Sequence, residues 1–286
     1  MSYLSLVLAT YGRSDLIGRF IASLEVQTSA DFELIIVDQN IDNRVVPYVD
    51  QARKAGIYVN HIRMAQPNLS AARNKGIAQA IGDIVAFPDD DCWYEPDVIE
   101  QVLTTFSTRQ HWSGLVADWV EAATTGNRAS PDPFLSSLKW RQFRGGDASS
   151  ITLFFKAEML RDIGGFDERF GVGQWFGAAE ETDLILAALA SGAQLARCAN
   201  IRVHHRFQTQ DTKALAGNWR AAMRRGRGTG ALYVKHRMNP WVVLRGFISP
   251  PINSVIQKQS IGGLLLSLAV SAGRVQGALL WALKFL

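Results

Sequence analysis

The first ninety residues alternate between continuous apolar runs and segments of helical periodicity, and few folds accept such a pattern. The apolar runs predict strands at about 4–9, 33–38, 57–63 and 83–88. Helices are predicted between them, at about 16–24, 43–55 and 70–81. Continuous apolar runs are typical of strands buried on both faces of a parallel sheet. The alternation therefore predicts an α/β fold with a mainly parallel, Rossmann-like sheet flanked by helices.

Two of these helices have a predicted N-cap residue. Asp15 precedes the first helix, and Asn68 precedes the third. Side-chain oxygens of Asp and Asn accept hydrogen bonds from the free backbone N–H groups of a first helical turn. We therefore expect both residues to fix where their helices begin.

The alternation weakens after residue 93, where the predicted elements are shorter and less regular. We expect helices at about 95–106 and 181–190, strands at about 114–119, 149–155 and 201–205, and a loop at about 122–133. The chain of 286 residues is long enough for one large α/β domain with a tail.

Cysteine usage and the amino-terminal sequence bear on the cellular compartment. The two cysteines, Cys92 and Cys198, lie far apart and form no CxxC pair. This spacing argues against a disulfide scaffold or a structural zinc site, and it suits a reducing compartment. The first residues lack a basic segment ahead of the apolar run, so we expect no signal peptide.

Polar residues follow three of the predicted strands, at the point where each strand ends. Thr10–Arg13 follows the first strand, Asp38 ends the second, and Asp89–Asp91 follows the fourth. Ligands of open α/β sheets bind beyond the carboxyl ends of the strands. The helix that carries Arg73 begins at the same edge, so carboxylates and cations are predicted to meet there. The chain contains neither a GxGxxG dinucleotide fingerprint nor a GxxxxGKS/T phosphate loop.

The three adjacent carboxylates of Asp89–Asp91 predict a site for a divalent cation. Mutual repulsion would raise the pKa of at least one of them, and a bound cation removes that cost. Carboxylate oxygens are typical ligands of Mg²⁺ or Mn²⁺, which also bind substrate phosphates. The alternative is a solvated acidic turn before the next helix. With Asp38 and Arg73 at the same edge, the pattern favours a nucleoside diphosphate bound with its cation.

Four segments resemble, in order, the motifs of the family 2 glycosyltransferases with the GT-A fold. They are Ala9–Arg13, Ile36–Asp38, Ala72–Gly76 and Phe87–Asp91, and the resemblance covers roughly residues 1–206. The resemblance implies a GT-A fold and an inverting transferase that uses a nucleotide sugar.

The resemblance also implies roles for single residues. The nucleotide would be held by Thr10, Tyr11, Arg13, Asp38, Arg73, Asn74, Asp89 and Asp90, and the metal by Asp91 together with Asp89. The family often has a second acid directly after the strand-end aspartate. This chain departs from that pattern, because Gln39 and Asn40 follow Asp38.

A second acidic segment, Glu180–Asp183, follows a glycine-rich stretch that contains Trp175. It is similar to the family's Glu-Asp motif, in which the second acid is the general base, and that position is Glu181 here. Such a base takes the proton of the acceptor hydroxyl. The same carboxylates also suit a first helical turn, where they interact favourably with the helix dipole. Glu180, Trp175 and Asp147 are candidates for contact with the acceptor.

Two adjacent histidines, His204 and His205, end the last predicted strand. Successive side chains on a strand point to opposite faces, so we expect at most one of them to be a ligand. The family resemblance implies that a histidine here completes the metal site, and we favour His205 over His204.

The last part of the chain is basic and then apolar. Residues 212–286 carry eleven Lys or Arg and no Asp or Glu, whereas the preceding part carries 19 basic and 26 acidic residues. Such asymmetry indicates an anionic partner. Residues 261–286 are almost wholly apolar, but Arg274 interrupts them before the roughly 20 residues that a spanning helix needs. We therefore expect 211–286 to lie in the membrane surface, and nucleic acid is disfavoured as a partner.

Two other interpretations of the tail stay open at this point. Its helices can pack on the preceding domain, or they can form a homodimer seam through Gly273 and Gly277. In each interpretation we expect residues 1–210 to form the catalytic domain. Its nucleotide-binding half would be 1–93 and its acceptor-binding half 94–210.

Our functional hypothesis is an inverting glycosyltransferase of cell-surface polysaccharide synthesis. It would use a UDP-, GDP- or dTDP-sugar with Mg²⁺ or Mn²⁺, and a glycan or polyprenyl-linked acceptor. We expect it to be peripheral, on the cytoplasmic face of the inner or plasma membrane. The alternatives are a sugar-phosphate nucleotidyltransferase and a non-enzymatic, membrane-attached module that binds a nucleotide or RNA.

Overall fold

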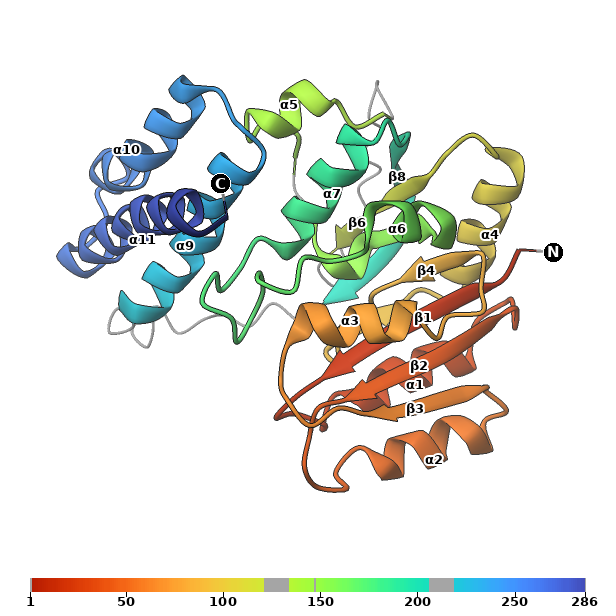
Figure 1. The fold of residues 1–286 in the computed structure, drawn as a ribbon. Coiled ribbons are helices and arrows are strands. Elements are labelled where there is room, and N and C mark those ends of the chain that lie inside the picture. Colours follow the sequence, from red (N-terminus) through yellow and green to blue (C-terminus); the bar gives the residue numbers. More distant parts are fainter. Residues whose placement is uncertain (1, 121–133, 147, 206–218, 286) are drawn as a thin grey trace.

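The computed structural model describes residues 2–120, 134–146, 148–205 and 219–285. Within these residues the strands form one mixed sheet in the order β3-β2-β1-β4-β7-β6-β8-β5 (Figure 1). The strands are β1 (Leu4–Thr10), β2 (Phe32–Asp38), β3 (Val59–Arg63), β4 (Ile84–Ala86), β5 (Cys92–Tyr94), β6 (Gly114–Val120), β7 (Leu153–Lys156) and β8 (Leu195–His205). The first four strands are parallel, whereas β7 runs antiparallel to both of its neighbours and β5 runs antiparallel to β8. The α/β class and the parallel first half of the sheet are confirmed.

Helices cover both faces of this sheet. They are α1 (Ile17–Glu25), α2 (Val46–Lys54), α3 (Leu69–Ile77), α4 (Val98–Thr108), α5 (Ser137–Arg141), α6 (Ala157–Ile163), α7 (Glu180–Ala190), α9 (Trp219–Lys235), α10 (Pro240–Ile256) and α11 (Ile261–Phe285). Because strand side chains alternate, Leu6 and Leu8 of β1 join a core with α1, α2 and α4. Val7 and Ala9 join a second core with α3, α6 and α7.

The acidic segment Asp89–Asp91 connects two distant strands. It leaves β4 in the middle of the sheet and enters β5, which is the edge strand beside β8. In the antiparallel register of this pair, Cys92 lies opposite His205. Asp91 is therefore brought next to His205, although 113 residues separate the two in sequence. The short strand β5 was not predicted, because three residues carry no readable period.

Several local predictions can be compared with the structure. Asn68 caps α3, where its side-chain oxygen accepts a hydrogen bond from the N–H of Ala71 at 3.1 Å. The prediction for Asp15 was wrong, since α1 begins after Leu16 and has no side-chain cap. The strand expected at 149–155 starts only at Leu153, after a 3₁₀ turn over Ser150–Thr152 (η1). The loop expected at 122–133 lies outside the described residues.

The tail helices pack on the domain and on one another, at the end of the molecule away from β3 and α2 (Figure 1). Glycines let α9 and α11 approach closely: a Cβ on Gly277 would lie 2.1 Å from the carbonyl oxygen of Arg227. Gly273 meets the carbonyl of Met223 in the same way. These glycines therefore contact α9 within the same chain, and the dimer seam that we considered through them was wrong. Trp281 of α11 is buried against Phe170 and Phe176.

Candidate functional site

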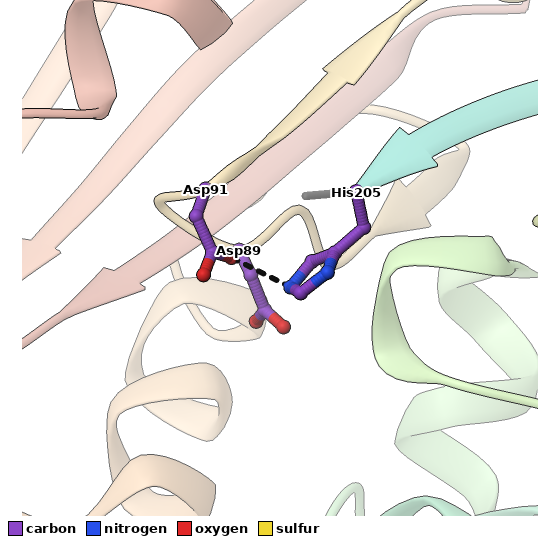
Figure 2. A group of neighbouring side chains, drawn as sticks. All are labelled: Asp89, Asp91 and His205. Carbon is purple, nitrogen blue, oxygen red and sulfur yellow. Dashed lines mark ion pairs between the residues drawn. The ribbon is translucent and has the colours of Figure 1, made fainter. Parts of the chain in front are cut away.

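A cluster of two carboxylates and one imidazole lies between the turn Asp89–Asp91 and the end of β8. Asp89, Asp91 and His205 each offer a ligand atom, and these atoms lie within 4.8 Å of one another (Figure 2). The Nε2 atom of His205 is 2.8 Å from Oδ1 of Asp91. Two carboxylate oxygens and an imidazole nitrogen form a donor set that suits Mn²⁺ or Mg²⁺. The cluster is therefore a fitting site for a divalent cation.

Asp89 and Asp91, the two aspartates of this cluster, have opposite pKa shifts. Burial raises the pKa of Asp89, and the charges of Glu181 and Asp91 add to this effect. Burial also acts on Asp91, but there the hydrogen bond and charge of His205 outweigh it and lower the pKa. Asp89 therefore holds its negative charge at a cost, which a bound cation would relieve.

The middle acid of the triplet points to the end of β1. Oδ2 of Asp90 accepts a hydrogen bond from the Thr10 hydroxyl at 3.0 Å, and Oδ1 lies 3.0 Å from the guanidinium of Arg13. Burial raises the pKa of Asp90 to about 6, although Arg13 and Thr10 oppose this shift. Arg13 also reaches Asp91 at 3.2 Å. Thr10 and Arg13 thus join the first strand end to the acidic turn, as the sequence predicts.

A single buried cation, Arg73, connects the acidic turn to the start of α7. Its side chain is only 2% exposed, and its guanidinium lies 3.2 Å from Asp89, 3.7 Å from Glu180 and 3.9 Å from Glu181. Burial raises the pKa of Glu180, followed by the charge of Glu181, while Arg73 opposes both. The positive charge of Arg73 therefore lies between Asp89 of the Asp89–Asp91–His205 cluster and Glu181, the predicted general base.

The buried Asp38 ends β2 and lies among donors. The N–H and side-chain amide of Asn40 each donate to it at 2.9 Å, and Nε2 of His61 is 3.1 Å away. Arg63 lies at 3.4 Å, because the parallel register sets it opposite Asp38. His61 and Arg63 were missed in the sequence, where the only available signal was their place on the neighbouring strand. Tyr11, which directly follows β1, is exposed.

Two predicted residues lie away from the cation cluster. The side-chain amide of Asn74 donates to the carbonyl of Phe166 at 2.8 Å, and its oxygen accepts from the N–H of Phe166 at 2.8 Å. Asn74 thus holds a loop beside α3 instead of facing the cluster. His204 stacks on Trp93 and lies 3.1 Å from Glu95, on the strand face opposite to His205. His204 therefore does not face Asp89 and Asp91, because successive side chains of a strand point to opposite faces.

A cavity of about 700 Å³ adjoins the start of α7. It is lined by Asp118, Trp119, Trp140 and Phe143 among others, and Thr182 also lines it. Since Thr182 follows Glu181 directly, this cavity is a candidate for an acceptor site. Trp175 does not line it. Its exposed ring lies under the guanidinium of Arg227, at 4.2 Å. Asp147, the third acceptor candidate, lies outside the described residues.

An ion-pair network fastens the tail to α7. The ammonium of Lys235 donates to Asp167 at 2.6 Å and to Asp183 at 2.7 Å, and Nε2 of His236 lies 2.7 Å from Asp183. Burial favours the neutral acid at Asp167, but hydrogen bonds from Arg169 and Lys235 prevail and lower its pKa to about 2. This network could not be predicted from the sequence, because its members lie up to 69 positions apart.

The mixed sheet flanked by helices is a fold of GT-A type. Residues 5–160 match the family model described as "Glycosyl transferase family 2". This match covers more than half of the chain, and the chain belongs to glycosyl transferase family 2.

Curated relatives carry glycosyltransferase names. The chain is 36% identical over 101 residues to the putative glycosyltransferase EpsH of Bacillus subtilis, covering 35% of this chain and 29% of EpsH. It is 26% identical over 186 residues to the glucosyl-dolichyl phosphate glucuronosyltransferase of Haloferax volcanii, covering 58% of this chain and 56% of that protein. The matched segments thus span less than two thirds of either relative.

Solved structures share the fold at low sequence identity. The S. aureus TarS 1–349 structure has a TM-score of 0.64 and 13% identity, and the match covers 96% of this chain and 92% of that one. The mannosyltransferase PcManGT of Pyrobaculum calidifontis, solved with GDP-Man and Mn²⁺, has a TM-score of 0.67 and 12% identity, covering 98% and 88%. TarS 1–349 has also been solved in complex with UDP-GlcNAc. These matches confirm the GT-A fold.

Proposed function

We propose that this chain is a metal-dependent, inverting glycosyltransferase that moves a sugar from a nucleoside-diphosphate sugar to an acceptor hydroxyl. The observation that carries the proposal is the position of Arg73, which contacts Asp89 of the cation cluster and Glu181 of α7 at once. A donor diphosphate held at the cluster would therefore have its sugar beside the Glu181 carboxylate. Family membership and the donor-bound structural neighbours support the same assignment.

The residues divide the reaction between them. Glu181 takes the proton of the acceptor hydroxyl, while that oxygen bonds to the anomeric carbon and the bond to the diphosphate breaks. Asp89, Asp91 and His205 would hold the cation, which supplies charge stabilisation for the departing diphosphate when bound. Arg13 contacts Asp90 and Asp91, and half of its side chain is exposed, so its guanidinium would also be accessible to the phosphates of the donor. Asp38 with His61 forms a polar wall for the nucleoside.

The decisive experiment compares wild type with Glu181→Gln on a panel of nucleotide sugars, with Mn²⁺ and a membrane lipid extract. We expect one donor to release free nucleoside diphosphate, and we expect the variant to lose this activity while keeping its thermal stability. Glu158→Gln is the matched control, because Glu158 is exposed and far from the cluster. Release of pyrophosphate would instead indicate a nucleotidyltransferase. Full activity of Glu181→Gln would refute the base assignment.

We further propose that the tail attaches the protein to the cytoplasmic membrane surface, where it meets a lipid-linked acceptor. By length and composition, α11 is long and apolar enough to span a membrane. Only 17% of an 18-residue apolar segment of this helix is buried within the protein, so the helix is not a core helix of the domain. Large apolar side chains are exposed along one side of it, at Ile261, Leu265, Leu268, Val275, Leu279 and Leu283. With no acid in residues 212–286, such a face suits an anionic membrane surface.

Point variants test this attachment without removing a helix. Leu265→Gln, Leu279→Gln and Leu283→Gln together are expected to abolish co-flotation with anionic vesicles, because they remove exposed apolar surface only. Ile41→Gln with Ile81→Gln is the control, since both residues are exposed but belong to the first ninety residues and not to the tail. Unchanged flotation of the α11 variant would contradict membrane attachment through this helix.

A further inference from the structure

Arginines gather in two adjoining cavities between α5, the end of α9 and α10. The cavities measure about 630 and 640 Å³, and both are lined by Arg144, Val242 and Arg245. Together they are lined by five arginines, which are Arg141, Arg144, Arg237, Arg245 and Arg274. We refer to the two cavities and these five residues as the arginine cleft.

Among the residues that the structure describes, no acid lines the arginine cleft. Neither cavity has an Asp or Glu in its lining, and residues 212–286 contain none at all. Across the described ranges, none of the five arginines takes part in an ion pair. Like charges that line a common cavity repel one another, and a bound anion relieves this repulsion.

The guanidinium groups have donors to spare. Arg141 donates to the carbonyl of Arg237 at 2.9 Å, and Arg245 and Arg274 donate to the carbonyls of Gln142 and Gly246. These bonds fix the side chains without compensating their charges. Each guanidinium has five N–H donors, and the buried Nε of Arg274 has no acceptor among the residues that the structure describes. Several forked donors around one cavity match the oxygens of a phosphate group.

The rim of the arginine cleft is apolar. Trp241, which lines one cavity, is 77% exposed, and the exposed Ile248 and Ile252 line the other. These residues lie on one side of α10, at helical spacing. A phosphate site framed by exposed aromatic and aliphatic side chains fits a ligand whose phosphate is joined to a hydrocarbon chain. The charge and the rim together therefore point to a lipid instead of a soluble phosphate.

We propose that the arginine cleft binds the phosphomonoester or diphosphate headgroup of a membrane lipid. The cleft also adjoins the cavity beside α7, because Phe143 lines both. If the proposed function holds, a lipid-linked acceptor seated here extends its hydroxyl past Phe143 toward Thr182 and Glu181. The cleft thus fixes the end of the acceptor that does not react.

Headgroup selectivity at equal surface charge distinguishes the cleft from general attraction to an anionic membrane. The probes are phosphatidylcholine vesicles that contain either phosphatidic acid or phosphatidylglycerol, adjusted to the same surface potential. We expect wild type to bind the phosphatidic acid vesicles about tenfold more tightly, because the monoester offers an additional charge to the forked donors. The variant Arg141→Gln/Arg144→Gln/Arg245→Gln is expected to lose this preference.

The control variant removes the same charge elsewhere on the tail. Arg220→Gln/Arg224→Gln/Arg225→Gln changes three exposed arginines of α9 that do not line the cleft, and it is expected to keep the preference. Arg144→Gln alone serves if the triple cleft variant fails to fold, since Arg144 is exposed and only its backbone is hydrogen-bonded.

Three outcomes would overturn the proposal. They are equal binding of wild type to both vesicles, a preference that survives in the cleft variant, and inorganic phosphate that binds the cleft as tightly as the vesicles do. Vesicle binding needs no turnover, so its result is independent of the nucleoside diphosphate assay. A cleft variant that binds lipid normally but lacks activity would count against this inference alone. Loss of activity in Glu181→Gln bears only on the proposed function.

Discussion

The buried guanidinium of Arg73 gives the most direct test of how this site is held together. It lies within 4 Å of three carboxylates, those of Asp89, Glu180 and Glu181, and only the first of these contacts is a hydrogen bond. Replacing Arg73 by Met keeps the length and apolar stem of the side chain and removes its charge. The change therefore leaves a cluster of acids in a protein interior without their common cation.

The expected magnitude follows from these distances. At an effective dielectric constant of about 20, a unit charge pair near 4 Å gains about 4 kcal/mol, so the three contacts give roughly 12 kcal/mol of gross attraction. Most of this offsets the cost of removing four charged groups from water, and the acids left behind can take up protons. Breaking a buried ion pair by removing one partner typically costs about 3–5 kcal/mol. We expect Arg73→Met to lower the free energy of unfolding by that amount.

The loss is expected to depend on pH in a defined direction. Arg73 opposes the raised pKa of Glu180, so the variant has a still higher pKa at this residue. A carboxyl whose pKa is raised in the folded state costs stability above that pKa, and the cost disappears as the pH falls through it. The part of the difference between wild type and Arg73→Met that is due to Glu180 should therefore shrink as the pH falls toward about 7, the pKa of Glu180 in the wild type, because below that pH this carboxyl is protonated in both folded proteins.

Denaturant unfolding at several pH values, in the presence of a chelator, measures this difference. Arg109→Met is the matched control, because Arg109 is exposed at the end of α4 and should change stability by less than about 0.5 kcal/mol. The reasoning is refuted if Arg73→Met unfolds like the control, or if its deficit grows as the pH falls.

Three further predictions concern the cation cluster, the tail seam and the link between tail and α7. His205→Gln should weaken Mn²⁺ binding by about tenfold or more in a titration followed by electron paramagnetic resonance, whereas His204→Gln should leave it unchanged, and equal effects would contradict the assignment. Gly277→Leu should destabilise by more than about 3 kcal/mol in thermal unfolding, since its Cβ would lie 2.1 Å from a backbone carbonyl of α9, while Ala272→Leu on the exposed side should be tolerated. Asp167→Asn should cost about 2 kcal/mol at neutral pH. The pKa of Asp167 falls from 3.8 in the unfolded chain to about 2 in the folded protein, so its charged form stabilises the fold at every pH above about 4. That deficit should vanish as the pH falls from about 4 to about 2, and a constant deficit would refute it.

The parts of the site that could be predicted are those that depend on the parallel half of the sheet. Thr10, Asp38 and Asp89 each follow an apolar run long enough to be recognised as a buried strand. Once such runs are parallel and adjacent, their carboxyl ends must lie at one edge. The convergence of these residues is therefore a consequence of periodicity and topology.

The parts that could not be predicted depend on antiparallel pairing and on surface contacts. β5 has three residues, yet its register opposite His205 determines which histidine faces the acids. The alternation rule limited the ligand to one of His204 and His205, but only the pairing with Cys92 selects between them. Likewise, α7 begins after Ala179 with a φ of 80°, a conformation that nothing in the residue type indicates.

The tail is part of the frame around the proposed base. Asp183 lies one half-turn after Glu181 in α7, and it is held by Lys235, the last residue of α9, and by His236, which follows it. Lys235 also reaches Asp167, so one ammonium joins α9 to two segments of the domain. α9 is in turn packed against α11 through glycines, so that the contacts of α9 with Asp183 also connect α11 to the start of α7. If the proposed membrane attachment through α11 holds, the tail would be an anchor that also fixes the position of the helix carrying Glu181.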